Sequence, residues 1–313
     1  MKRVFTMVLV MIALAVLPLP VSAAGLQVAG KSSVLMDLET GTVLQEHNAH
    51  EALAPASVTK IMTMLLIMEA VDSGKIAMTD TVTASETAAA KGGSQVYLKA
   101  GETMSVSDML KSIAVSSAND CACAMAEHLA GSEAAFVDAM NKRAQELGME
   151  DTHFVNCTGL DDSAEASEHK TSAHDIAIMS RELLKNHPDI KKFTTIWMDT
   201  IRNGAFGLTN TNRLVRFYRG ATGLKTGSTS KAGFCVSVTA ERGGLSLICV
   251  IMGAPSRDVR NAQATRLLDW GFANYGVYNH TPKELEELKV LGGKSDSMEI
   301  KYESFSFVKE KRS

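Results

Sequence analysis

A run of apolar residues from Val58 to Asp72 constrains the fold more than any other feature of this sequence. The run is rich in Met, Ile and Leu, it follows Pro55, and Ser73 and Gly74 end it. Its length and composition predict a helix of about four turns that is apolar on nearly every face. Because such a helix has to be buried, the rest of the chain must form a core around it.

Ser57 and Lys60 are polar residues at the start of this helix. Three positions separate them, so their side chains share one face. The serine would lie beside free backbone N–H groups and the positive end of the helix dipole. A lysine early in a buried helix is poorly solvated, which lowers its pKa and allows it to act as a base. The alternative is a helix-capping serine with a lysine whose amine reaches water.

The spacing alone does not identify this pair, because the pattern S-x-x-K also occurs elsewhere in the chain, for example from Ser167 and from Ser228. Only Ser57 has a buried helix behind it. Two further motifs follow along the chain, Ser-Ala-Asn at 117–119 and Lys-Thr-Gly at 225–227. Together, the three predict a serine acyl-transfer site with a lysine base.

The second motif lies between amphipathic helices predicted over 107–115 and 118–130. At such a turn a hydroxyl and an amide can point into a cleft. Ser117 would pass a proton between the lysine and the leaving amine, and Asn119 would hydrogen-bond the substrate backbone. Both residue types are also preferred helix caps, so capping of the second helix is the alternative.

The third motif falls within a strand predicted over 223–229. Lys225 and Gly227 share one face of that strand, and a glycine inside a strand often marks close approach of another backbone or a ligand. A lysine facing the cleft would hold a substrate carboxylate, and would disfavour protonation of Lys60 if the two ammonium groups are close. The alternative is an exposed edge strand with a solvated lysine.

Strand-like segments lie at both ends of the main part of the chain, with helices between them. This order predicts an α+β fold, in which a sheet carries helices on its faces and a helical insertion leaves a cleft. The polar stretch 153–170 is expected to form a loop over that cleft. The other predicted elements are strands over 34–37, 42–46, 233–242 and 245–252, and helices over 133–147, 172–185 and 256–275.

The first residues predict a targeting segment. Lys2 and Arg3 precede an apolar core from Val4 to Leu19, and small residues at 21–24 form a cleavage site. The apolar run is short for a membrane span, so we expect a cleaved secretory signal over 1–24 and an exported protein.

The last part of the chain differs from the main domain. Residues 289–291 and 298–308 resemble short strands, separated by a Gly-Gly turn at 292–293. We therefore expect a main domain over 25–276 and a short or truncated β-type domain over 277–313. No membrane anchor is visible in the sequence, and membrane association is left open.

Composition indicates which classes of partner and cofactor are not expected. The net charge is −3 with no basic patch, so nucleic acid is not expected as a partner. Cys121 and Cys123 point to different faces of a predicted helix, and the five cysteines form neither a disulfide framework nor a zinc pattern. His47 and His50 lie among turn residues and are expected to be solvated. We expect no metal and no organic cofactor.

With these motifs in order, the chain from about Ala24 to Tyr275 resembles the D-alanyl-D-alanine carboxypeptidases, which are low-molecular-mass penicillin-binding serine peptidases. The middle motif has Ala118 where the general pattern of this superfamily has aspartate. The resemblance implies a β-lactamase/transpeptidase-like antiparallel sheet flanked by helices. It extends beyond the motifs, over 55–63, 116–120, 147–149, 152–156, 159–161 and 223–227.

The resemblance also implies a mechanism on a peptidoglycan stem peptide ending in D-Ala-D-Ala, in cell-wall synthesis and remodelling. Ser57 would attack the penultimate carbonyl with Lys60 as base, and Ser117 would help to protonate the departing D-Ala. β-Lactams would acylate the same serine. The substrate would be bound by Asn119, Lys225, Thr226, Gly227 and Ser228, with backbone N–H groups of Ser57 and Ser228 holding the oxyanion.

The sequence departs from the family pattern in two places. The loop from Cys157 to Thr171 carries Ser, Glu and His where relatives usually have a Pro- or Gly-containing stretch and Tyr-Ser-Thr, which affects substrate contacts near the loop. Relatives also commonly carry a full β-rich C-terminal domain and a terminal membrane-binding helix, whereas 288–308 resembles only the start of that domain and 309–313 is no anchor.

Two alternatives to the carboxypeptidase remain. A class A-like β-lactamase would need a carboxylate that activates the deacylating water; Glu165 and Glu168 lie in a suitable loop, but the Glu-x-x-Leu-Asn segment is absent there and 182–186 matches it imperfectly. A non-catalytic wall-binding module with the penicillin-binding fold is the other alternative. Such a module would usually have lost a motif residue, and here all the motif residues are present.

Overall fold

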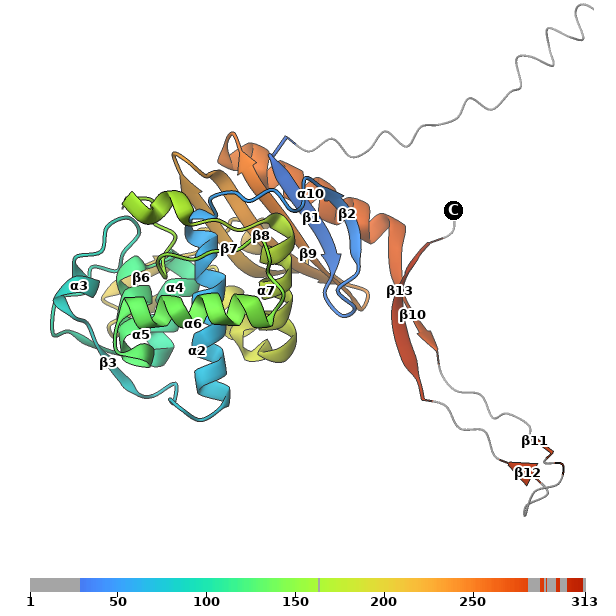
Figure 1. Cartoon of the computed structure of the whole chain (residues 1–313), viewed down its shortest axis with the longest axis horizontal. Helices are drawn as coiled ribbons and strands as arrows, with labels where there is room; N and C mark the ends of the chain where they lie inside the picture. Colours follow the sequence, from blue (N-terminus) through green and yellow to red (C-terminus); the bar gives the residue numbers. More distant parts are fainter. Residues whose placement is uncertain are drawn as a thin grey trace, which may run out of the picture.

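A computed structural model describes residues 29–162, 164–280, 288–289, 291, 297–298 and 303–311. The expected signal segment at 1–24 lies outside the described residues. The main body is a sheet with helices on both faces and a further helical layer on one side (Figure 1). The predicted α+β fold is confirmed.

The sheet has five antiparallel strands in the order β2-β1-β9-β8-β7. Because β1 pairs with β9, the first and last parts of the main domain form one layer. Each strand predicted for this sheet is present, and β7 is at its edge. The strands are β1 (Ser32–Asp37), β2 (Val43–His47), β7 (Ala221–Thr229), β8 (Gly233–Arg242) and β9 (Leu245–Ala254).

Alternation along the strands builds two cores, one on each face of the sheet. Val34 and Met36 join the core that contains α2 (Lys60–Asp72) and α7 (Ala173–Asn186), whereas Leu35 joins the core beneath α10 (Arg257–Asn274). The remaining helices are α3 (Glu86–Ala89), α4 (Val106–Ser116), α5 (Asn119–Ala130), α6 (Glu133–Glu146), α8 (Lys191–Thr194) and α9 (Leu214–Phe217), with 3₁₀ turns η1 (Ala56–Thr59), η2 (Ala164–Glu168) and η3 (Pro188–Ile190).

Helix α2 is buried over most of its length, as its composition predicts. Its start differs from the prediction, because the α-helix begins at Lys60 and Ser57 lies in the preceding turn η1. Ala56, with φ of +48°, has a left-handed backbone that an α-helix cannot contain. Neither η1 nor α2 has a side-chain cap, so Ser57 is not the helix cap of the alternative interpretation.

Two small antiparallel pairs were not predicted from the sequence. They are β3 (Thr81–Thr83) with β4 (Thr103–Ser105), and β5 (Met198–Ile201) with β6 (Phe206–Thr209). The second pair leads directly into the segment 209–213, which reaches the site described below.

The chain continues from α10 into β10 (Tyr275–His280), which pairs with β13 (Phe305–Glu310) in a ribbon that extends from the main body (Figure 1). A second short pair joins β11 (Leu288–Lys289) and β12 (Ser297–Met298). The division into domains at 276 stays a prediction. Among the described residues, no helix combines the length and the apolar character that crossing a membrane requires.

Candidate active site

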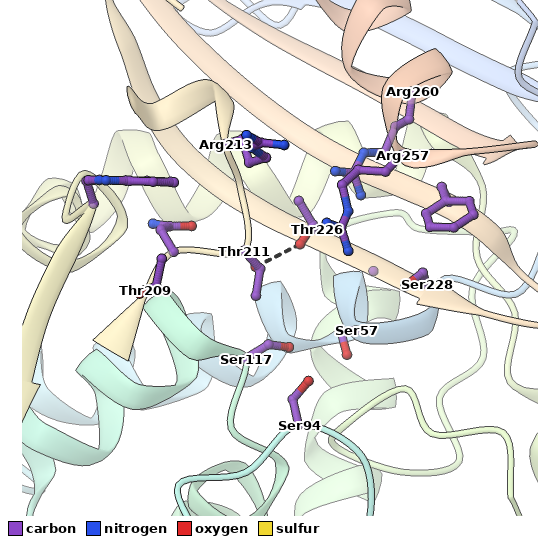
Figure 2. Close-up of a pocket in the computed structure, with 14 residues that line it drawn as sticks. Ser57, Ser94, Ser117, Thr209, Thr211, Arg213, Thr226, Ser228, Arg257 and Arg260 are labelled. Atoms are coloured by element: carbon purple, nitrogen blue, oxygen red, sulfur yellow. Dashed lines mark hydrogen bonds between the residues drawn. The ribbon is translucent and has the colours of Figure 1, made fainter. Parts of the chain in front are cut away.

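Three segments that are far apart in the sequence meet around one cavity of about 450 Å³. They are the turn η1, the junction of α4 and α5, and the edge strand β7. Figure 2 shows Ser57, Ser94 and Ser117 on one side of the cavity, and Thr226 with three arginines on the other. Its lining comprises Ser57, Ser94, Ser117, Trp197, Thr209, Asn210, Thr211, Arg213, Thr226, Gly227, Ser228, Phe234, Arg257 and Arg260.

Ser57 and Lys60 are in direct contact. The Nζ atom of Lys60 lies 3.0 Å from Ser57 Oγ and donates to the carbonyl oxygen of Thr158 at 2.7 Å. Lys60 is fully buried. Burial lowers its pKa to about 7, although Cys157 and Asp120 act in the opposite direction. Near neutral pH, a substantial fraction of this amine is therefore unprotonated and can accept a proton from Ser57.

Strand β7 approaches the turn of Ser57 at Gly227. A Cβ atom added to Gly227 would lie 2.8 Å from both the carbonyl oxygen of Pro55 and the backbone nitrogen of Ser57. A real Cβ does not tolerate such contacts, so only glycine permits this approach. The close backbone approach predicted from the sequence is confirmed, and it places the main chain at Ser57 beside that at Gly227.

Ser117 ends α4 in a left-handed conformation, with φ of +62°. Its side chain is almost fully buried, and within the described part of the chain its hydroxyl has no hydrogen-bond partner. Helix α5 is preceded by Ala118 and has no side-chain cap, so Ser117 and Asn119 do not cap it. The capping alternative is therefore wrong, and a substrate contact of the Ser117 hydroxyl stays a prediction.

Asn119 holds a neighbouring loop. Its Nδ2 donates to the carbonyl oxygen of Gly92 at 2.7 Å, and its backbone N–H donates to that of Ser94, also at 2.7 Å. These bonds bring Ser94 to the cavity lining. The Oδ1 atom of Asn119 is buried and, among the described residues, has no partner.

Lys225 is buried, with 1% of its surface exposed, so the alternative of a solvated lysine is wrong. Its Nζ donates to the carbonyl oxygen of Thr226 at 2.9 Å. Burial, followed by the charges of Lys60 and Arg260, lowers its pKa well below the ordinary value. Lys225 is not among the lining residues, whereas Thr226 is, and a substrate contact of Lys225 stays a prediction.

The cations that do line the cavity are Arg213, Arg257 and Arg260, and sequence reasoning missed all three. Arg260 donates to the carbonyl oxygen of Cys235 at 3.2 Å, and burial lowers its pKa to about 10. On the same side, Thr226 Oγ1 donates to Thr211 Oγ1 at 2.8 Å (Figure 2). No local motif marks any of these arginines.

The carboxylates considered for a β-lactamase lie elsewhere. Glu165 and Glu168 are exposed on η2. Among the described residues that line the cavity, none is Asp or Glu. All five cysteines are buried and free, in line with the expectation that they form no disulfide framework.

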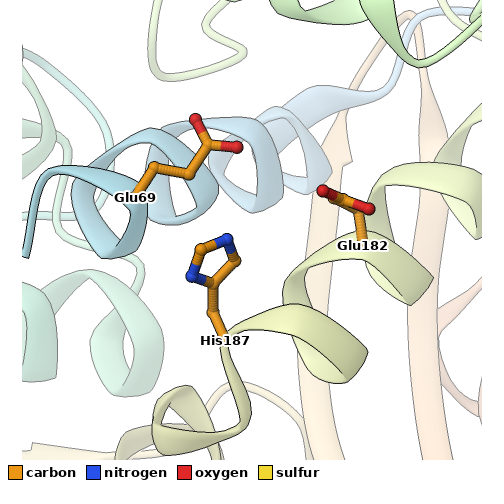
Figure 3. A group of neighbouring side chains, drawn as sticks. All are labelled: Glu69, Glu182 and His187. Atoms are coloured by element: carbon orange, nitrogen blue, oxygen red, sulfur yellow. The ribbon is translucent and has the colours of Figure 1, made fainter. Parts of the chain in front are cut away.

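Glu182 belongs to a cluster with Glu69 and His187, whose side chains face one another (Figure 3). Such a group could in principle hold a cation. Here the guanidinium of Arg143 donates to Glu69 at 2.7 Å and to Glu182 at 2.6 Å. Both carboxylates thus already pair with one guanidinium, and we assign the cluster a structural role.

Comparison with known proteins agrees with this geometry. Residues 19–256 match a family described as D-alanyl-D-alanine carboxypeptidase. The chain belongs to this family. It is a serine-type D-Ala-D-Ala carboxypeptidase and a penicillin-binding protein.

Its relatives cover most of the chain. The carboxypeptidase DacF of Bacillus subtilis is 48% identical over 278 residues, which span 86% of this chain and 69% of DacF. DacA of Escherichia coli is 35% identical over 284 residues, spanning 86% of this chain and 68% of DacA. Penicillin-binding protein 5 of Haemophilus influenzae superposes with a TM-score of 0.81 at 32% identity, covering 91% of this chain and 83% of that structure.

Proposed function

We propose that this carboxypeptidase removes the terminal D-Ala from peptidoglycan stem peptides through an acyl-enzyme on Ser57. The observation that carries the proposal is the 3.0 Å contact between Ser57 Oγ and a buried amine whose pKa is about 7. A lysine of this kind acts as a general base near neutral pH. Penicillin-binding protein D2 of Listeria monocytogenes, 31% identical with a TM-score of 0.72, has been solved in an ampicillin-bound form.

Acylation follows from the positions of these groups. Lys60 takes the proton of the Ser57 hydroxyl as Oγ bonds to the penultimate D-Ala carbonyl. The oxyanion accepts hydrogen bonds from the backbone N–H groups of Ser57 and Ser228, which the close approach at Gly227 supports. As the C–N bond breaks, the proton held by Lys60 passes through Ser117 to the departing amine, which leaves Lys60 neutral again. Water then hydrolyses the ester, restoring Ser57 and releasing the shortened peptide.

The substrate carboxylate would bind on the side of the cavity opposite Ser57. Thr226 supplies a hydroxyl there and Arg260 a positive charge, with Lys225 directly behind Thr226. The buried Oδ1 of Asn119, which has no hydrogen-bond partner among the described residues, would accept a substrate backbone N–H.

We further propose that the enzyme is exported through its signal segment 1–24 and acts in the cell envelope, in the cell wall or periplasm, with a catalytic domain over 25–276. β-Lactams would acylate Ser57 and leave slowly, because they mimic the scissile amide. The mechanism requires no metal or organic cofactor, and nucleic acid is not a partner. The lining of the cavity, as far as the structure describes it, offers no carboxylate for the rapid deacylation of a β-lactamase.

The deciding experiment incubates the mature protein with a fluorescent penicillin and follows the intact mass over time. We expect a stable adduct on Ser57, its loss in Ser57→Ala with the fold preserved, and release of D-Ala from a pentapeptide. Rapid turnover without a lasting adduct would instead indicate a β-lactamase. No reaction with either compound would indicate a non-catalytic wall-binding module.

A further inference from the structure

His169 is a buried histidine that the mechanism above does not use. It is 4% exposed, and its ring packs against Phe154 with centroids 5.7 Å apart. Its backbone is held on the C-terminal side by two antiparallel bridges, in which Lys170 pairs with His153 and Thr171 pairs with Leu53. The ring is therefore fixed relative to the segment that enters the turn of Ser57.

A chain of hydrogen bonds leads from His169 to that turn. The backbone N–H of Val155 donates to His169 Nδ1 at 3.1 Å, His169 Nε2 lies 2.8 Å from Thr59 Oγ1, and Thr59 Oγ1 donates to the carbonyl oxygen of Ala56 at 2.8 Å. Since an N–H can only donate, Nδ1 is the acceptor and Nε2 carries the proton. His169 thus donates to Thr59, whose own proton goes to Ala56, and the direction of the chain is unambiguous.

The carbonyl group of Ala56 lies between the segment that carries Ser57 and the segment that binds Lys60. Ala56 directly precedes Ser57 and has a φ of +48°, a left-handed conformation that L-residues rarely adopt. On the other side, a Cβ atom on Gly159 would lie 1.8 Å from this carbonyl oxygen. The neighbouring Thr158 supplies the carbonyl that binds Lys60.

We propose that His169 is a positioning residue for acylation: through Thr59 it fixes the Ala56 carbonyl, and with it the orientation of Ser57 toward Lys60. His169 does not touch the reacting atoms. The inference rests on the proposed acyl-enzyme at Ser57 and adds the residue that holds the nucleophile's turn in place.

Only the neutral form of His169 can accept the hydrogen bond from Val155 and donate the one to Thr59. An imidazolium would direct a second N–H at the N–H of Val155. Burial, together with the charges of His153 and Lys60, lowers the pKa of His169 to about 4. The hydrogen-bond chain therefore persists throughout the pH range in which Lys60 can act as a base.

The test compares His169→Ala with His169→Gln. Glutamine offers one acceptor for the Val155 N–H and one donor for Thr59, whereas alanine offers neither. We expect His169→Ala to lower kcat and the rate of penicillin acylation about tenfold to a hundredfold, with KM little changed, because misplacement of reacting groups has effects of this size. His169→Gln should retain most of the rate, and His153→Ala, which alters an exposed histidine on the same bridge, should match wild type.

Thr59→Val provides a second, shape-conserving variant that removes the hydroxyl. It should reproduce the loss in His169→Ala, and the double variant should be no slower than either single one, because both break one chain. If His169→Ala fails to fold, His169→Gln and Thr59→Val still decide. Melting temperatures establish that each variant compared is folded.

The inference is overturned if His169→Ala acylates at the wild-type rate, if a folded His169→Gln is as slow as His169→Ala, or if Thr59→Val has no effect. It is likewise overturned if the entire loss is in KM. Failure of wild type to form the Ser57 adduct would refute the proposed function, whereas an adduct-forming wild type beside a fully active Thr59→Val would refute only this inference.

Discussion

The two buried lysines of the site, on α2 and β7, have lowered pKa values but different surroundings. Lys60 contacts the Oγ of Ser57 at 3.0 Å and is anchored to the Thr158 carbonyl at 2.7 Å. Lys225 donates to the carbonyl of Thr226, the next residue in its own strand, at 2.9 Å. Burial makes both amines easier to deprotonate, but only Lys60 has a hydroxyl proton within reach.

Burial alone therefore does not assign a catalytic role. Lys60 lies three residues after Ser57 on the same face, so the local chain sets their geometry. Lys225 reaches the site through sheet pairing, and its position depends on how closely β7 approaches η1. We accordingly expect changes at Lys60 to affect the chemical step, and changes at Lys225 to affect substrate binding.

The largest effect should come from Lys60→Met, which keeps the length of the side chain and removes the base. Acylation by penicillin should fall about 10³-fold to 10⁴-fold, within the range of general-base contributions. Lys60→Arg should not rescue it, because a guanidinium retains its proton. Second-order acylation rates measure both. A Lys60→Arg enzyme near the wild-type rate would mean that charge, not proton transfer, is what matters.

Lys225→Met should have a smaller effect of a different kind. We expect kcat/KM for a D-Ala-D-Ala peptide to fall about a hundredfold, mainly through KM, because the variant loses an amine that a bound substrate carboxylate would keep protonated. Steady-state kinetics separate the two parameters. If kcat falls while KM is unchanged, the distinction between the two lysines is wrong and Lys225 takes part in the chemistry.

The pH dependence sharpens the assignment of the base. Lys60 must be neutral to accept a proton, and its pKa is about 7. The acylation rate should therefore rise about tenfold per pH unit below pH 7 and level off above it. Stopped-flow acylation between pH 5 and 9 measures this profile. A profile without a limb near 7 would exclude Lys60 as the base.

Gly227→Ala tests the contact that joins the two regions. Its Cβ would lie 2.8 Å from the backbone nitrogen of Ser57, so β7 has to move away from η1. We expect acylation to fall about tenfold or more, because the oxyanion donors separate. Gly207→Ala on β6 is the matched control, since a Cβ there has no neighbour within 4 Å. Equal rates in the two variants would contradict the proposed close approach.

The sequence predicts those parts of the site that depend on local structure. Ser57 with Lys60, the turn at Ser117 and the glycine at Gly227 are each apparent from spacing and context, and the structure brings them together. The predicted start of α2 is wrong by two residues, because nothing in the alanine side chain of residue 56 indicates a left-handed backbone.

Residues that reach the site only through tertiary packing could not be predicted. Arg213 follows an unpredicted hairpin, and Arg257 and Arg260 begin a helix whose sequence indicates only that it closes the domain. His169 is more than 100 positions from Thr59, and a single histidine in a polar loop is ordinarily solvated. Contacts of this kind become apparent only when the fold sets the distances.

The smallest effect, on stability, should again distinguish a buried lysine from an exposed one. Folding lowers the pKa of Lys60 from 10.5 to about 7, so between these values the unfolded chain holds a proton that the folded chain has lost. The free energy of unfolding therefore rises with pH across this window. The destabilisation caused by burying Lys60 is complete below pH 7 and absent above pH 10.5.

Lys60→Met should accordingly melt a few degrees above wild type at pH 7, with a smaller gain at pH 10. Lys192→Met, at an exposed site, should show no such trend in a thermal melt. A gain that is the same at both pH values would mean that folding does not lower the pKa of Lys60.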